Sequence, residues 1–96
     1  MTRRVPPQII SSSQFLLKLN KGSNHTLFCR GEGSPKPTVS WKKDGRPLND
    51  TSSTRVVGDK VQLFNLGRQD GGIYACQFEN SVGFISQPIK VIVEGE

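Results

Sequence analysis

The chain contains few of the residues that carry chemistry. Its 96 residues include two cysteines, one histidine, one tryptophan and one tyrosine. A zinc centre takes about four ligands, and the only histidine, His25, lies too close to Cys29 to add much. A catalytic thiol needs a base, but His25 is expected on the strand of Cys29 rather than opposite Cys76. Facing carboxylates and a phosphate-binding loop are also missing, so we expect no enzyme, no cofactor and no metal.

Long apolar runs are absent as well. No run approaches the roughly 18 residues that a membrane span requires. The opening stretch MTRRVPPQ has two arginines but no apolar segment of a signal peptide behind it. We therefore expect no direct insertion into a membrane. The chain is interpreted as a fragment of a longer protein, whose compartment its first residues do not reveal.

Positive charge exceeds negative charge but is not concentrated. Thirteen Lys and Arg against eight Asp and Glu give a net charge of +5. These basic residues are spread from Arg3 to Lys90, and the only tight pairs are Arg3-Arg4 and Lys42-Lys43. A solvated basic surface is favoured over a specific acidic ligand, and no nucleic-acid partner is expected.

Apolar residues alternate with polar ones along most of the chain. A period of two indicates half-buried strands, and stretches such as KDGRP and LGRQDGG are typical of the turns between them. We expect strands at 8–10, 15–19, 23–30, 38–43, 54–57, 60–66, 72–79 and 83–93. Short strands at regular spacing with no helical segment predict an all-β antiparallel sandwich.

The two cysteines, Cys29 and Cys76, are 47 positions apart and each falls on the inward face of its expected strand. A structural disulfide is favoured over a metal site or a reactive thiol. On the chain-entropy model, closing a loop of this length stabilises the fold by about 4 kcal/mol.

The surroundings of the cysteines resemble one family. Trp41 follows Cys29 by twelve residues, and DGGIYAC places Tyr74 two residues before Cys76. With GEGSPKPTVSW, KDGRPL and NSVG, these motifs resemble the I-set of the immunoglobulin superfamily over nearly the whole chain. The resemblance implies a two-sheet antiparallel Greek-key sandwich. It makes residues 6–94 the domain, residues 1–5 a linker and residues 95–96 a linker to a next domain.

The resemblance also implies structural roles. Trp41 is expected to cover a Cys29–Cys76 disulfide, and the Tyr74 hydroxyl to bond backbone upstream at a corner that Asp70 steadies. The implied core includes Leu27, Leu63 and Leu66. Gly31 is smaller, and Phe78 larger, than the residue that the family usually has at that position. This predicts that their volumes compensate in one core layer.

Two outward faces are candidate binding surfaces. On one sheet, Phe28 and Phe64 are expected to form a cross-strand aromatic pair. On the other sheet, Ile73 and Phe84 point outward.

We favour the face with Phe84, because Lys42 and Lys90 are expected to supply a polar rim around it. Phe28 instead competes with a possible glycan, since Asn24 shares its side of the strand. Asn24-His25-Thr26 and Asn49-Asp50-Thr51 are both N-glycosylation sequons.

The resemblance implies a non-catalytic protein–protein interaction module of the cell adhesion, receptor or matrix type. Such a module belongs to a larger extracellular or cell-surface protein, and its partners are a homophilic or heterophilic protein and the neighbouring domains. One alternative is an intracellular structural module of a sarcomeric or cytoskeletal protein. A second alternative is a receptor domain that binds glycosaminoglycan such as heparan sulfate. Its candidate residues are Lys18, Lys21, Arg30, Lys42, Lys43, Arg46 and Lys90.

Overall fold

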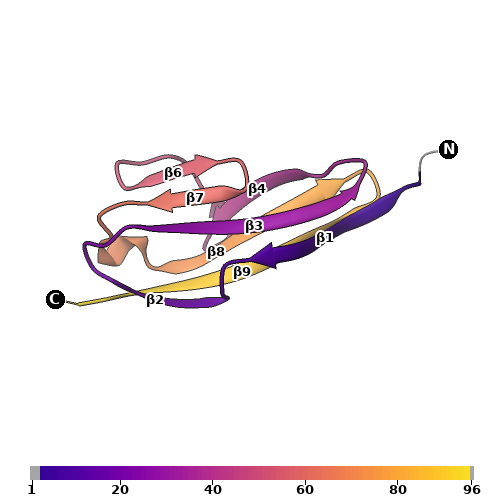
Figure 1. Ribbon diagram of the computed structural model, residues 1–96. Helices are drawn as coiled ribbons and strands as arrows, with labels where there is room; N and C mark the ends of the chain where they lie inside the picture. The colour runs from indigo at the N-terminus through magenta and orange to yellow at the C-terminus, as the bar shows by residue number, and fades with distance from the viewer. Residues whose placement is uncertain (1–2, 96) are drawn as a thin grey trace.

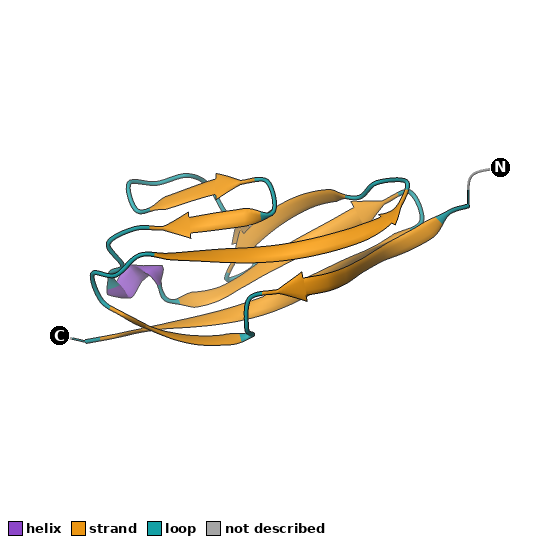
Figure 2. Ribbon diagram, in the orientation of Figure 1, coloured by secondary structure: helices purple, strands orange, loops and turns teal. Residues whose placement is uncertain are grey.

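The computed structural model describes residues 3–95, so residues 1, 2 and 96 of the expected linkers lie outside the described residues. Strands dominate it, with one short helical turn (Figure 2). The elements are β1 (Val5–Ser12), β2 (Leu16–Asn20), β3 (His25–Ser34), β4 (Thr38–Lys43), β5 (Arg46–Pro47), β6 (Thr54–Val57), β7 (Lys60–Leu63), the 3-10 turn η1 (Arg68–Asp70), β8 (Gly72–Asn80) and β9 (Gly83–Glu94). Within residues 3–95, no helix is long and apolar enough to cross a bilayer.

The strands form two packed sheets. One has the order β1-β3-β7-β6 and the other the order β2-β9-β8-β4-β5. The molecule is elongated, 57 × 22 × 19 Å, and the chain enters and leaves at opposite ends of the long axis (Figure 1). The expected two-sheet sandwich is confirmed.

One strand pair departs from the antiparallel pattern. After β1 the chain crosses from the first sheet to the second, where β2 runs parallel to β9, with Leu16 opposite Lys90 and Asn20 opposite Glu94. The buried Ser13 stabilises this crossing, because its amide donates to the Phe28 carbonyl and its hydroxyl accepts from the Phe28 amide. The second sheet is therefore mixed.

Each expected strand is present; β4 and β6 have the expected bounds, and the others differ at one or both ends. The strand expected at 60–66 ends at Leu63, and the amide of Phe64 instead donates to the carbonyl of Ser53. The stretch between β4 and β6 holds only the two-residue β5. The turn η1 lies inside the segment LGRQDGG, which was expected to be a simple turn.

The core is built around a disulfide between Cys29 on β3 and Cys76 on β8, which joins the two sheets. Trp41 on β4 lies directly opposite Cys76. Its side chain is buried, and its indole nitrogen donates to the Gly58 carbonyl at 3.1 Å. The remaining buried apolar side chains are Leu27, Val61, Leu63, Leu66, Tyr74, Phe78, Ile89 and Val91. Inward positions of the alternating strands thus fill the space between the sheets.

Candidate functional site

The corner at DGGIYAC has a structural role. The Tyr74 side chain is buried, and its hydroxyl donates to the backbone carbonyl of Asp70. One Asp70 carboxylate oxygen accepts from the Ser53 hydroxyl at 3.0 Å, and the other from the Gly67 amide at 2.8 Å. With both oxygens bonded, Asp70 holds η1 and the segment before β6 in place.

Burial raises the pKa of Tyr74 well above its usual value, and the neighbouring carboxylates of Asp70 and Asp44 raise it further. Above the ring, the Lys43 ammonium lies 5.5 Å from the ring centroid and donates to the Gln69 carbonyl. The Lys43 ammonium therefore interacts with groups of this corner rather than with solvent alone.

The outer face of the five-stranded sheet presents apolar side chains at two separate places. Leu16, Lys90 and Ile73 lie directly opposite one another across β2, β9 and β8. Ile73 is 48% exposed and Leu16 38% exposed. Phe84, 68% exposed, lies near the other end of β9, opposite Glu79.

The expected rim of Lys42 and Lys90 around Phe84 is wrong. Lys90 is six residues from Phe84 along β9, which separates them by roughly 20 Å. Lys42 lies opposite Ala75, and Ala75 lies opposite Pro88, so Lys42 is also displaced from Phe84 along the strands. Both lysines border Ile73 instead.

The expected aromatic pair on the four-stranded sheet is also wrong. Phe28 lies opposite Lys60, because β3 and β7 pair in a register that matches Thr26 with Gln62. Phe64 comes four residues after Lys60 and beyond the end of β7. Each phenylalanine is partly exposed, 38% for Phe28 and 41% for Phe64, but the two do not form a cross-strand pair.

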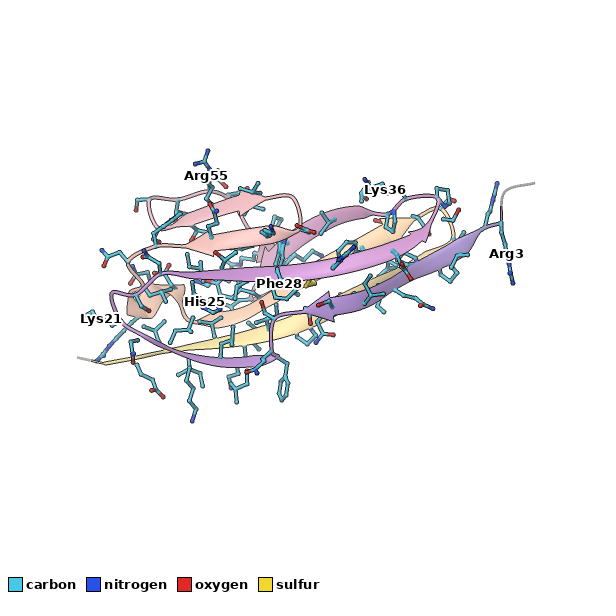
Figure 3. The ribbon with its side chains drawn as sticks, viewed as in Figure 1. Arg3, Lys21, His25, Phe28, Lys36 and Arg55 are labelled. Carbon is cyan, nitrogen blue, oxygen red and sulfur yellow. A yellow bond between two sulfur atoms is a disulfide. The ribbon has the colours of Figure 1, made fainter. Side chains whose placement is uncertain are left out.

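The basic residues proposed for a sulfated polysaccharide are divided among several surfaces. Lys18, Lys42 and Lys90 share the outer face of the five-stranded sheet. Arg30 lies on β3 in the other sheet, and Lys43 is engaged above Tyr74. Figure 3 shows Lys21 near the carboxyl-terminal end, Arg3 and Lys36 near the amino-terminal end, and Arg55 on β6. Across residues 3–95, positive charge therefore does not form one continuous track.

Both sequon asparagines are exposed. Asn24 lies just before β3, and its side-chain oxygen accepts from the Asn65 amide at 2.9 Å. Asn49 follows β5 in the connection to β6. Both positions leave room for a glycan outside the core.

Two hydrogen-bonding residues were missed from the sequence. The Asn80 amide group donates to the carbonyls of Val5 and Pro35, while its oxygen accepts from the amides of Val82 and Gly83. This side chain joins three segments at the amino-terminal end. The signal was NSVG, which is typical of a tight turn.

Asp44 is the second missed residue. Its carboxylate accepts from the Ile73 amide at 3.0 Å, and its own amide donates to the Ile73 carbonyl at 2.8 Å. The Asp-Gly dipeptide in KDGRP is a hairpin signal, and Asp44 adopts the positive φ of 51° that such a turn uses.

Two surface pockets lie toward the ends of the sandwich. One of about 250 Å³ is lined by Val5, Glu32, Gly33 and Ser34. A second of about 310 Å³ is lined by Lys43, Leu48, Thr51, Ser52, Ser53, Thr54, Gln69 and Asp70. The charged groups Lys43 and Asp70 of the second pocket already make the structural bonds of the tyrosine corner. The strand faces therefore offer the better candidate binding surface.

Comparisons with known proteins agree with this architecture. The model of the immunoglobulin domain family matches residues 6–80. The neuronal cell adhesion molecule of Mus musculus is 33% identical over 88 residues, which is 88% of this chain and 7% of that protein. Contactin-1 of Bos taurus is 30% identical over 93 residues, which is 97% of this chain and 9% of that protein. The chain thus spans less than a tenth of these relatives.

Solved structures show the same fold at lower identity. Titin domain M7 superposes with a TM-score of 0.86 at 22% identity, covering 99% of this chain and 100% of that one. Immunoglobulin domains 1–4 of Sidekick-1 give a TM-score of 0.89 at 23% identity, covering 96% of this chain and 25% of that one. The disulfide, the buried Trp41, the tyrosine corner and the family match lead to one assignment. The chain belongs to the immunoglobulin domain family.

Proposed function

We propose that this domain is a protein–protein interaction module of a larger cell-surface or secreted adhesion protein. The chain is a non-catalytic domain, so its contribution is recognition. The observation that supports a binding role is the outer face of the five-stranded sheet, where Leu16, Ile73 and Phe84 are exposed on hydrogen-bonded strands. Apolar anchors on a rigid surface are typical of protein interfaces.

The disulfide and the sequons support an extracellular location. Disulfides persist in oxidising compartments and are rare in the cytosol, and the sequon residues Asn24 and Asn49 are exposed. Relatives named as adhesion molecules support the same location. The alternative, an intracellular sarcomeric module, is supported by the likeness to titin domain M7, which rests on fold alone.

Binding of heparan sulfate is the weaker proposal. Sulfated chains are bound by clusters of cations, and the affinity falls with salt. Only Lys18, Lys42 and Lys90 of the candidate cations share the outer face of the five-stranded sheet. That face also carries apolar groups, which a polysaccharide would leave unused.

An oligomeric fusion of the domain, applied to cultured cells, tests the proposed function. A protein partner predicts binding that protease treatment of the cells abolishes and heparinase treatment leaves intact. Loss of binding after heparinase alone would instead support the polysaccharide. Mass spectrometry of protein isolated from its native source tests the compartment, because an extracellular domain is expected to carry the oxidised cysteine pair and a glycan on Asn24 or Asn49.

A further inference from the structure

We infer that the partner of this domain is an acidic protein surface rather than a second copy of the chain, and that it docks around Ile73. This inference rests on the proposed function and names the chemistry of the partner. The site, called the lysine-rimmed patch below, consists of Leu16, Lys18, Lys42, Ile73, Pro88 and Lys90. These residues come from β2, β4, β8 and β9.

The strand registers place the apolar members of this patch together. Leu16, Lys90 and Ile73 form one row across three strands. Pro88 lies two residues before Lys90 on β9 and opposite Ala75. Neighbouring positions in such rows are about 5 Å apart across the sheet and about 7 Å apart along a strand. The apolar side chains therefore share one area of the sheet, with Lys90 among them, and this area is separate from Phe84.

Lysines lie within this surface and on two of its sides. Lys90 lies between Leu16 and Ile73 in their row. Lys18, opposite Ile92, is a diagonal neighbour of Lys90 at roughly 8 Å. Lys42 approaches from β4, opposite Ala75.

Two carboxylates among residues 3–95 lie next to the patch. Asp44 accepts from the Ile73 amide, so its charge is held at one corner. Glu94, opposite Asn20, is a diagonal neighbour of Lys18, whereas Glu79 is four residues from Ala75 along β8. Three ammonium groups against two carboxylates leave the patch with an excess of positive charge, so complementary carboxylates on a partner would be attracted to it.

Charge argues against a second copy. A two-fold dimer buries the same surface of both partners, so Lys18, Lys42 and Lys90 of both copies would be gathered in one interface. Like charges brought together across an interface weaken the association. The net charge of +5 adds a repulsion between whole molecules. An acidic partner avoids both costs.

The size of the patch indicates a modest affinity. Four strands and three rows span on the order of 300 Å² by their spacings, less than the roughly 800 Å² that each partner buries in a standard interface. The contact is thus expected to extend beyond the patch and to weaken as salt rises.

The test uses the isotope-labelled domain and three probes: a random copolymer of glutamate and tyrosine, poly-glutamate and heparin. Four proteins are titrated: the parent, Lys90→Glu, Ile73→Ser and the control Lys60→Glu. Lys60 is exposed on β7 in the other sheet, beside the exposed apolar side chains of Phe28 and Val57. The control therefore makes the same charge change in a comparable setting.

We expect the copolymer to bind more tightly than poly-glutamate and to shift amide resonances of β2, β8 and β9. Lys90→Glu should weaken copolymer binding about tenfold, and Lys60→Glu less than about twofold. Ile73→Ser should weaken binding of the copolymer but not of poly-glutamate. Equal losses for Lys90→Glu and Lys60→Glu would overturn the inference in favour of attraction by overall charge. If heparin binds more tightly than the copolymer, and Ile73→Ser does not change heparin binding, the patch would be assigned to a polysaccharide.

Three further outcomes separate this inference from the proposed function. Sedimentation that shows a dimer of the parent protein, lost in Ile73→Ser, would assign the patch to a second copy and overturn the inference. Protease-sensitive binding to cells that survives both Lys90→Glu and Ile73→Ser would also overturn it, while supporting the proposed function. Absence of protease-sensitive binding would overturn the proposed function, and the copolymer titration would still decide the chemistry of the patch.

Discussion

The ring of Phe78 occupies the space that a side chain at residue 31 would fill. A Cβ added to Gly31 would lie 2.7 Å from Cδ2 of that ring, closer than such atoms approach. Phe78 is buried on β8 between Val39 on β4 and Ile85 on β9. The glycine on β3 and the phenylalanine on the opposite sheet thus share one layer of the core, and the predicted compensation of their volumes agrees with this contact.

Gly31→Ala should destabilise the domain by about 1–3 kcal/mol, because the added methyl group overpacks the layer. Denaturant unfolding of the parent and the variant measures this loss. Gly83→Ala is the matched control, since its Cβ would meet only Pro6, at an ordinary distance of 3.8 Å. In the Gly31→Ala background, Phe78→Leu should cost less than it does in the parent. Equal costs in both backgrounds would mean that the two residues do not share space.

Tyr74→Phe should destabilise by about 1–3 kcal/mol, because it removes a buried hydrogen bond and leaves the Asp70 carbonyl without that partner. The free energy of unfolding, obtained from denaturant melts, measures the change. An unchanged midpoint would show that the hydroxyl does not stabilise the corner.

Tyr74 should also resist ionisation. The pKa of this hydroxyl is raised in the folded state above its usual value of 10.0, first by burial and then by the nearby Asp70 and Asp44. The folded state therefore binds more protons than the unfolded state above pH 10. Stability is fully present below that pH and falls above it, with a slope of up to about 1.4 kcal/mol per pH unit.

Because Tyr74 is the only tyrosine, the near-ultraviolet absorbance of tyrosinate reports on it alone. Folded protein should show no tyrosinate as the pH rises through 10, whereas protein in denaturant should titrate near 10. The Tyr74→Phe variant should lose this part of the alkaline decline in stability. A normal titration in folded protein would contradict the burial of the hydroxyl.

The disulfide should contribute about 4 kcal/mol, as expected for closing a loop with a sequence separation of 47. Unfolding in the presence and absence of reductant measures this contribution. Thiol titration of denatured, unreduced protein secreted from cells should find no free thiol. Two free thiols in that material would sink the prediction that Cys29 and Cys76 are paired.

Phe84→Ala should leave the melting midpoint nearly unchanged, because that side chain is 68% exposed. Ile89→Ala on the same strand should cost about 2–5 kcal/mol, because Ile89 is fully buried. Thermal melts of the two variants compare outward and inward positions of β9. A large fall in the melting midpoint of Phe84→Ala would place Phe84 in the core and contradict the orientation of the strand.

Local pattern accounts for the parts of the fold that were predicted. Alternation depends on neighbours two residues apart. It therefore identified the strands and predicted that Leu27, Cys29 and Trp41 face inward. Turn residues such as those of KDGRP separated the strands for similarly local reasons. The spacing of Cys29, Trp41, Tyr74 and Cys76 supported the family resemblance, and that resemblance predicted the disulfide covered by Trp41 and the tyrosine corner.

Only the tertiary structure decided which outward residues meet. Alternation says which side of a strand a residue faces, but not which residue of another strand lies beside it. The pairing of Phe28 with Lys60 separated Phe28 from Phe64, and the rows across β2, β9 and β8 placed Lys90 beside Ile73 instead of Phe84. Register depends on packing between segments far apart in the chain and on the turns that join them. The sequence therefore determined the strands and the inward-facing core, while the folded chain determined which lysines and apolar residues share one surface.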